Sequence, residues 1–130
     1  MNADRAGARI IVVDDDVDLG MSMAAVLRIE LSPDVEVVVT HDGLDALDEV
    51  SMAPLPVAVV LDLSMPGMSG LETAAAIRCS SPAAKGTALV AVSGDETLLD
   101  CARRSGYFRL IQRKPIDFEA LLLLLKSLSR

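Results

Sequence analysis

Five short apolar segments that contain β-branched residues recur along the chain. Polar residues rarely interrupt them, which is typical of strands that are buried on both faces of a parallel sheet. Between these segments, apolar residues recur at the three- and four-residue spacing of helices that present one face to a core. The predicted strands are residues 9–13, 35–40, 57–61, 87–92 and 109–113.

A helical pattern follows each predicted strand, and the regular alternation is that of an α/β protein with helices on both faces of its sheet. We therefore predict a doubly wound, five-stranded parallel sheet with five helices. The pattern ends with the last helix, near Arg130, so we predict one domain over residues 1–130 with no effector domain. The apolar helix positions are Leu19, Met23, Val26 and Leu27; Leu44, Leu47 and Val50; Leu71, Ala74 and Ala75; Leu98, Cys101 and Ala102; and Phe118, Leu121, Leu122 and Leu125.

Three features favour a cytoplasmic protein that does not enter a membrane. No apolar run reaches the roughly 18–20 residues of a membrane span. Residues 1–9 lack the apolar stretch of a signal peptide. Cys79 and Cys101 match no metal-ligand spacing, and we interpret them as reduced residues of the core or of helices.

Charge and aromatic content argue against direct binding to nucleic acid. The formal net charge is −7, which repels a phosphate backbone. The three aromatic residues, Tyr107, Phe108 and Phe118, are too few for a base-stacking platform.

Carboxylates follow two of the predicted strands at the point where each strand ends. Asp14, Asp15 and Asp16 follow the first strand, and Asp62 follows the third. Ligands of an open α/β sheet bind beyond the carboxyl ends of its strands, so we expect these acids to share one edge. Clustered carboxylates are tolerated when a cation binds, and hard oxygen ligands select Mg²⁺, Mn²⁺ or Ca²⁺. Taken singly, Asp16 or Asp18 would be a turn residue or a helix N-cap.

The fourth and fifth strands bring a hydroxyl and an amine to the same edge, in Ser93 and Lys114. A carboxylate can act as a nucleophile toward phosphorus, while a metal ion and an amine can neutralise phosphoryl oxygens. Phosphoryl transfer depends mainly on such positioning and charge stabilisation. Asp62 is the preferred nucleophile because it stands alone at its strand end.

These strand-end motifs resemble the receiver domain of two-component response regulators, and the resemblance runs from Arg9 to the last helix. It implies a flavodoxin-like strand order, 2-1-3-4-5. It also implies a phosphorylatable signalling switch that is not an enzyme with a separate substrate. The motifs are Ile11-Val12-Val13-Asp14-Asp15-Asp16, Val60-Leu61-Asp62-Leu63-Ser64-Met65-Pro66-Gly67, Ala91-Val92-Ser93-Gly94 and Lys114-Pro115.

The resemblance also implies where phosphate and metal would bind. Asp62 would accept the phosphoryl group from a histidine kinase or a histidine phosphotransfer protein. Asp14, Asp15, Asp62 and the backbone carbonyl of Ser64 would bind Mg²⁺ or Mn²⁺.

Three further residues resemble those through which the family responds to phosphorylation. Ser93 resembles the switch hydroxyl of the family and Lys114 its invariant lysine, while Pro115 would follow a cis peptide bond. Phosphorylation would change the face formed by the fourth helix, fifth strand and fifth helix, where a downstream protein or a second copy would bind. The family usually has an aromatic residue three positions before the lysine. Ile111 stands there instead, so either the strand entrance accommodates an extra residue or the aromatic switch is absent.

The last helix has two leucines, Leu123 and Leu124, outside its predicted core stripe. Two adjacent surplus leucines suggest a docking or dimer surface. A wider apolar stripe that meets the sheet is the other interpretation.

The sequence argues against two rival functions and leaves a third open. A haloacid dehalogenase-type phosphatase needs a second aspartate two residues after its nucleophile, and Ser64 occupies that position. A dinucleotide-binding module needs a glycine-rich loop after the first strand, where this chain has acids. A receiver-like interaction module that works without phosphorylation stays open as the alternative, because Ile111 departs from the family pattern.

Overall fold

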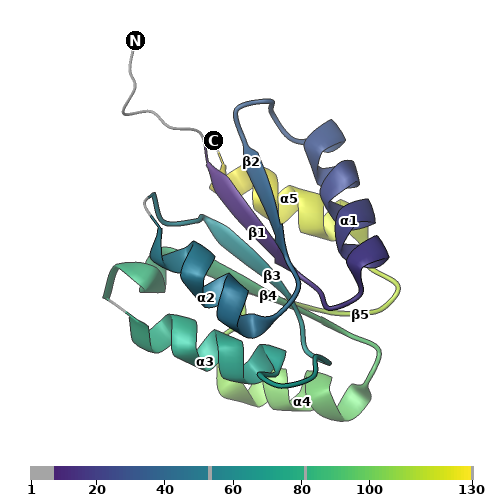
Figure 1. The fold of residues 1–130 in the computed structure, drawn as a ribbon. Helices are drawn as coiled ribbons and strands as arrows, with labels where there is room; N and C mark the ends of the chain where they lie inside the picture. Colours follow the sequence, from purple (N-terminus) through teal and green to yellow (C-terminus); the bar gives the residue numbers. More distant parts are fainter. Residues whose placement is uncertain (1–7, 53, 81, 130) are drawn as a thin grey trace.

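Within the described residues, five strands alternate with five helices, as predicted (Figure 1). The computed structural model describes residues 8–52, 54–80 and 82–129. Each strand begins and ends within one residue of its predicted bounds, and the sequence did not predict the short 3₁₀ helix η1. The elements are β1 (Arg9–Val13), α1 (Val17–Glu30), β2 (Glu36–Thr40), α2 (Gly43–Ser51), β3 (Ala58–Asp62), α3 (Gly70–Ser80), η1 (Pro82–Gly86), β4 (Ala88–Ser93), α4 (Glu96–Ser105), β5 (Leu110–Arg113) and α5 (Phe118–Leu128).

The strands form one parallel sheet in the order β2-β1-β3-β4-β5, which confirms the predicted flavodoxin-like topology. Val13 of β1 lies opposite Leu61 of β3, and Leu61 lies opposite Ala91 of β4. The carboxyl ends of these three central strands therefore lie side by side. They lie next to the position where the order of the strands reverses, which is the usual ligand site of such sheets.

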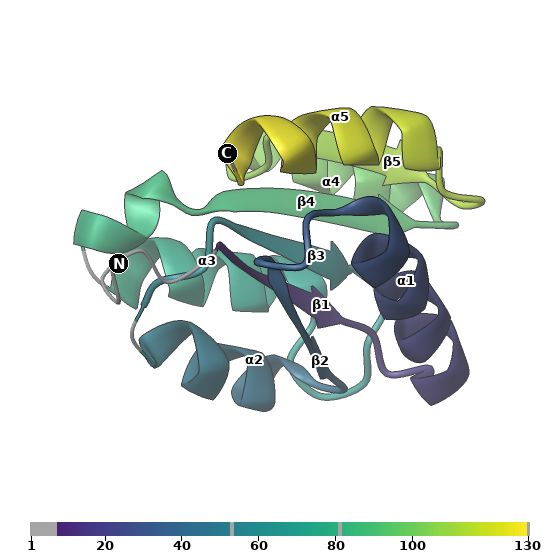
Figure 2. The same cartoon turned by 90° about the horizontal axis from the view of Figure 1, so that it is seen from above.

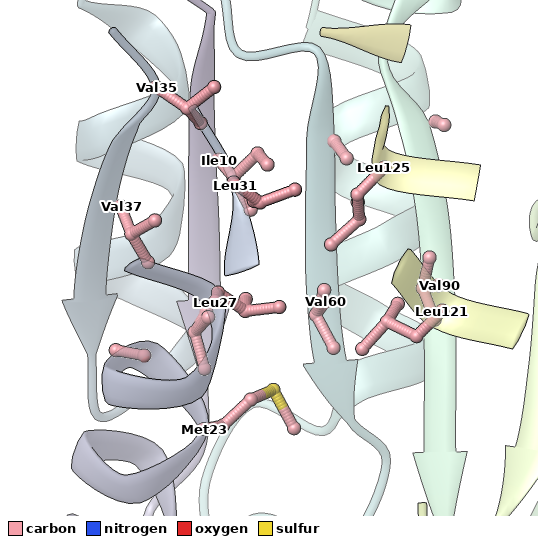
Figure 3. Close-up of a cluster of buried hydrophobic side chains, with 14 of the residues drawn as sticks. Ile10, Met23, Leu27, Leu31, Val35, Val37, Val60, Val90, Leu121 and Leu125 are labelled. Carbon is pink, nitrogen blue, oxygen red and sulfur yellow. The ribbon is translucent and has the colours of Figure 1, made fainter. Parts of the chain in front are cut away.

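Alternate residues of the central strands face two different layers of helices. Ile10 and Val12 pack in a cluster with buried residues of α1 and α5 (Figure 3). Ile11 and Val13 point the other way and pack in a cluster with residues of α2 and α3. Figure 2 shows α5 and α2 on opposite sides of the sheet. Burial on both faces explains why the strands are almost continuously apolar.

The leucines of α5 divide differently from the predicted stripe. Leu121 and Leu125 are fully buried, and Leu124 packs against the same core although it is partly exposed. Leu123 is 69% exposed. Leu124 thus belongs to a wider core stripe, and the docking hypothesis applies to Leu123 alone.

Some residues predicted to face the core are exposed. Leu19 and Leu44 lie in the first turns of α1 and α2, with exposed fractions of 51% and 64%. These turns begin at the carboxyl edge of the sheet and have less of the sheet beneath them. Cys79 and Cys101 are free and exposed, so their placement on helices is confirmed and their placement in the core is wrong.

None of the helices in the described part of the chain has both the length and the apolar content to cross a bilayer. Residues 1–7, to which most of the signal-peptide prediction applies, lie outside the described residues, and so does Arg130.

Candidate functional site

Three carboxylates meet at the carboxyl edge of the sheet. Asp14 follows β1, and Asp62 ends the neighbouring strand β3. Both side chains are buried, with exposed fractions of 5% and 6%, whereas Asp15 is exposed. One carboxylate oxygen from each of the three lies within 4.8 Å of those of the other two. The predicted convergence of these acids is confirmed.

Backbone amides fix the orientation of the two buried carboxylates. The Oδ1 atom of Asp14 accepts a hydrogen bond from the Asp16 N–H at 2.9 Å. The Oδ1 atom of Asp62 accepts one from the Ser64 N–H at 3.0 Å. These bonds hold each aspartate in place before any ligand binds.

The third aspartate of the run does not join the cluster. Asp16 is the N-cap of α1, and its side chain accepts a hydrogen bond from the Leu19 N–H at 3.2 Å. An N-cap oxygen satisfies one of the unpaired amides at a helix start. The N-cap interpretation is therefore confirmed for Asp16.

The carboxylate cluster carries excess negative charge. Burial is the main cause that raises the pKa of Asp14 to about 6, and the nearby charge of Asp62 raises this pKa further. The amide of Asp16 and the charge of Lys114 act in the opposite direction. A cation would relieve the repulsion, and three hard oxygen ligands on one edge suit Mg²⁺ or Mn²⁺. The donor set thus fits the metal that the sequence suggests.

Asp14→Asn should stabilise the metal-free protein at neutral pH by about 1–2 kcal/mol. The pKa of Asp14 is higher in the folded protein, at about 6, than in the unfolded chain. Ionisation of Asp14 therefore lowers the free energy of unfolding as the pH rises through about 6. Denaturant unfolding with a chelator measures the free energy of unfolding at about pH 7.5 and about pH 4.5. The stability that Asp14→Asn gains over the wild type should be smaller at the lower pH. Asp15→Asn removes an exposed carboxylate and should give a smaller gain. A loss of stability in Asp14→Asn at both pH values would contradict the charge argument.

Lys114 forms an ion pair with Asp62. Its Nζ atom is 3.6 Å from the Asp62 Oδ2 atom, and its backbone N–H donates to the Ser93 carbonyl at 2.9 Å. The Lys114–Pro115 peptide bond is cis, as predicted. Asp62 therefore lies close both to two other carboxylates and to an amine.

Ser93 is fully buried at the end of β4, one residue beyond Val92, the partner of Asp62 in the sheet. Its hydroxyl oxygen accepts a hydrogen bond from the Asp95 N–H at 3.0 Å. A serine hydroxyl has one donor in addition to its acceptor sites. Among the described residues this hydroxyl donates no hydrogen bond, so its proton is available to a ligand at the carboxyl end of β4. Asp95 itself caps α4, where it accepts from the amides of Thr97 and Leu98.

Gly70 supports the site, and we did not single it out from the sequence. A β-carbon built at this buried residue would lie 2.4 Å from the Asp62 carbonyl oxygen and 2.7 Å from the Leu63 Cα. The start of α3 therefore packs directly on the backbone that carries Asp62. The sequence contains one signal for this helix start, because Ser69 and Glu72 have the spacing of a capping box. The structure shows both reciprocal bonds of that box, each 3.1 Å long.

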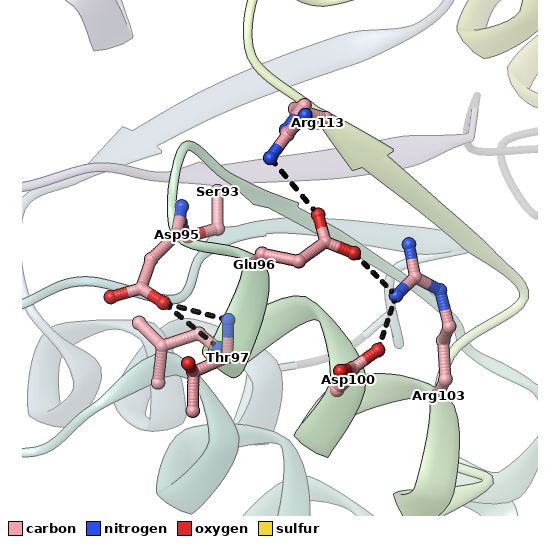
Figure 4. A network of polar contacts seen from close by, with 8 residues as sticks. Ser93, Asp95, Glu96, Thr97, Asp100, Arg103 and Arg113 are labelled. Atoms are coloured by element: carbon pink, nitrogen blue, oxygen red, sulfur yellow. Dashed lines mark hydrogen bonds and ion pairs between the residues drawn. The ribbon is translucent and has the colours of Figure 1, made fainter.

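Ion pairs join the end of β5 to the first turn of α4 (Figure 4). Glu96 accepts from Arg113 and from Arg103, each at 3.1 Å, and Arg103 also pairs with Asp100 at 2.7 Å. These side chains are more than half exposed, so each pair adds little stability. Their arrangement nevertheless links the strand that leads into Lys114 with the helix that follows Ser93.

A groove of about 590 Å³ opens beside the carboxylates, between α1 and the loop that follows β5. Asp14 and Lys114 lie at its polar end. Most of the remaining lining is apolar and includes Met23, Val26 and Phe118. A partner that reaches Asp62 along this side would meet an apolar surface next to the charged site.

Comparison with known proteins identifies the class to which this fold and site belong. Residues 10–126 match the family model of the response regulator receiver domain. The chain belongs to this family. Receiver domains are signalling switches that are phosphorylated on an aspartate with Mg²⁺ and that act with histidine kinases and downstream targets, and the carboxylate cluster of this chain agrees with that chemistry.

Curated relatives are longer than this chain. A protein-glutamate methylesterase/protein-glutamine glutaminase of Myxococcus xanthus is 36% identical over 107 residues, which are 81% of this chain and 30% of that protein. The transcriptional regulatory protein ZraR of Klebsiella oxytoca is 31% identical over 118 residues, which are 91% of this chain and 25% of that protein. The chain thus spans less than a third of the length of these two relatives.

Solved structures of receiver proteins have the same fold. The response regulator protein TrrA of Thermotoga maritima, solved in complex with Mg²⁺-BeF, has a TM-score of 0.77 and 26% identity. A CheY-like receiver domain of Methylobacillus flagellatus has a TM-score of 0.75 and 27% identity. Each match covers 93% of this chain and 98% of the other chain.

Proposed function

We propose that Asp62 is the phosphoacceptor of this receiver domain and that the phosphoryl donor is a phosphohistidine of a kinase or phosphotransfer protein. The supporting observation is the position of the Asp62 carboxylate, buried between the acids Asp14 and Asp15 and the amine of Lys114. A nucleophile so placed is close both to a positive charge and to a group of carboxylates that can bind a cation. Both features suit the charge that develops on a phosphoryl group in transfer.

The transfer exchanges one bond at phosphorus for another. An oxygen of Asp62 attacks the phosphorus atom, and the bond between phosphorus and the donor imidazole nitrogen breaks. The imidazole keeps the electron pair, and Asp62 becomes an acyl phosphate. When bound, Mg²⁺ or Mn²⁺ neutralises phosphoryl oxygens, and its proposed ligands are Asp14, Asp15, Asp62 and the Ser64 carbonyl. Lys114 stabilises the negative charge of the phosphoryl group through its amine, which already pairs with Asp62.

Ser93 is the proposed sensor of the phosphoryl group. Its hydroxyl can keep the bond from the Asp95 amide and donate its own proton to a phosphoryl oxygen. Movement of Ser93 would reach β5 by two routes, the Ser93–Lys114 backbone bond and the Glu96–Arg113 ion pair. This coupling supports the predicted output face of α4, β5 and α5 for a downstream protein or a second copy. It does not need an aromatic residue at position 111.

We also propose a binding surface for the phosphodonor protein. The apolar groove beside Asp14 and Lys114 would receive the phosphodonor protein, because a donor histidine must approach Asp62 across this surface.

We propose a cytoplasmic signalling role without turnover of a separate substrate and without direct binding to nucleic acid, which the net charge of −7 disfavours. The extent of the receiver domain over residues 1–130 stays a prediction.

Intact-mass spectrometry tests the proposed function. The protein is incubated with a small-molecule phosphodonor and Mg²⁺, and the expected product is a single phosphoryl adduct that is labile, as an acyl phosphate should be. A chelator in place of Mg²⁺ should prevent the adduct. An unmodified mass with Mg²⁺ present would favour the interaction module that works without phosphorylation.

Lys114→Met should slow adduct formation by about tenfold or more, because the variant removes the positive charge closest to Asp62. The same mass assay, run as a time course, measures the rate. Lys126→Met removes the same charge from the exposed last turn of α5 and should leave the rate unchanged. Equal rates for wild type and Lys114→Met would exclude a role for this amine in transfer.

A further inference from the structure

A second polar site lies at the opposite end of the sheet from Asp62, where strands β4 and β5 begin. It is a cavity of about 240 Å³ between the end of α3, η1 and the turn that joins α4 to β5. Arg78, Lys85 and Arg109 line it, together with Gly86 and Gly106. Three basic residues therefore line this cavity, and no acidic residue of the described part of the chain does. The local charge is opposite to the net charge of −7.

Arg78 is held rigidly at this cavity. Its Nη1 atom donates to the carbonyls of Ala84 and Thr87 at 3.0 and 2.7 Å, and its Nη2 atom donates to the Tyr107 carbonyl at 2.9 Å. A guanidinium has five N–H donors. These three bonds use three of them, so two N–H groups have no hydrogen-bond partner among the described residues. The guanidinium is therefore already oriented and still has donors for a ligand.

The charge of Arg78 also lacks a neutralising partner among the described residues. Its hydrogen bonds go only to neutral carbonyls, and burial alone lowers its pKa. By contrast, the equally rigid Arg9 pairs with Glu36 and Glu49. A half-buried guanidinium without a carboxylate partner gains from an anion, because charge-assisted hydrogen bonds are the stronger class.

The walls of the cavity leave room for a ligand. A β-carbon built at either Gly86 or Gly106 would meet nothing within 4 Å. Lys85 and Arg109 are exposed side chains that line the same cavity as Arg78 and can move toward a bound group. A phosphate group matches this set, since arginine binds phosphate through paired N–H donors and lysine binds it as a mobile point charge.

We propose that Arg78, Lys85 and Arg109 form a binding site for a small phosphate-class anion, either free phosphate or a phosphomonoester. The site is distinct from the phosphorylation site. A ligand there would bridge the connection from α3 to β4 with the connection from α4 to β5, and so stabilise the folded domain in proportion to its occupancy.

Backbone amide NMR tests this proposal. Inorganic phosphate and, in a second arm, glycerol 3-phosphate are titrated at constant ionic strength with a chelator present and no divalent cation. Saturable shifts are expected at Gly86, Thr87 and Gly106. Tighter binding of glycerol 3-phosphate would indicate a phosphomonoester as the natural ligand, and tighter binding of phosphate would indicate the free anion.

The matched variants use exposed residues, so that the fold is preserved. The double variant Lys85→Gln, Arg109→Gln should weaken binding by about tenfold or more, while Arg104→Gln on the exposed surface of α4 should not change it. Circular dichroism verifies that all the variants are folded. The proposal is overturned if no saturable shifts occur at these three amides, or if the double variant binds as tightly as wild type. In that case the basic residues only complement the carbonyl ends of α3 and α4.

Discussion

Asp62→Asn is expected to abolish the phosphoryl adduct completely. An amide oxygen is not a nucleophile toward phosphorus under these conditions, and the variant also loses one of the charges that would hold Mg²⁺. Asparagine has nearly the same shape, and its side-chain oxygen can still accept the hydrogen bond from the Ser64 amide. The loss of the adduct would therefore report on chemistry and not on misfolding. Intact-mass spectrometry with a phosphodonor and Mg²⁺ measures the effect.

The stability of this variant gives a second and independent readout. Asp14 and Asp62 repel each other, and the Asp62 charge is one cause of the raised pKa of Asp14. Asp62→Asn should therefore be at least as stable as the wild type in metal-free buffer. A variant that loses both the adduct and much of its stability would point to a structural defect.

Asp48→Asn is the matched control, since it makes the same substitution at an exposed position of α2. It should form the adduct at the wild-type rate. An adduct that persists on Asp62→Asn would contradict the assignment and would direct attention to Asp14 or Asp15.

The sequence predicted the carboxyl edge of the sheet well because the evidence there is local. Each strand is a short apolar run, and the residue that ends it is read directly from the chain. Once the strands are parallel, Asp14 and Asp62 must share an edge, and β1 and β3 are neighbours in the structure as the resemblance implied. The cis bond before Pro115 was likewise predicted from a motif and is present.

The errors concern properties that depend on the depth of packing. Spacing alone placed Leu19 and Leu44 on core faces, but a helix can extend past the sheet that it covers, and both residues are exposed. Leu124 shows the reverse error. It was placed outside the core stripe of α5, yet it packs against the core because the buried face of this helix is wider than the stripe. Only tertiary contacts determine how wide such a face is.

Interactions between residues distant in sequence were also missed. Nothing in the chain shows that Glu96 and Arg113 pair, because the first turn of α4 and the end of β5 come together only in the folded protein. The basic cavity around Arg78 is similar, since its three cations come from α3, from η1 and from the turn before β5. Each residue by itself is an ordinary surface arginine or lysine. Their shared position is a property of the fold.

Gly70→Ala is expected to destabilise the domain by about 3 kcal/mol or more. Intrinsic helix propensity predicts the opposite sign, because alanine is better than glycine in a helix by about 1 kcal/mol. The steric clash should outweigh the gain in helix propensity. The new β-carbon would lie 2.4 Å from the Asp62 carbonyl oxygen and 2.7 Å from the Leu63 Cα, and both atoms belong to the backbone. Either α3 or the end of β3 must move. Denaturant unfolding measures the change in stability.

Gly86→Ala is the control for Gly70→Ala, because a β-carbon at Gly86 meets no atom within 4 Å. It should be neutral or stabilise the domain by a few tenths of a kcal/mol, about the gain expected when the unfolded chain loses freedom. Opposite signs for the two substitutions would show that contact, and not the loss of a glycine, causes the effect.

Gly70→Ala should also slow phosphorylation in the mass assay under conditions where it is still folded, because Asp62 shifts with its own carbonyl. A Gly70→Ala protein as stable as Gly86→Ala would mean that α3 can move away from β3 without cost, and the proposed support of Asp62 by this helix would be wrong.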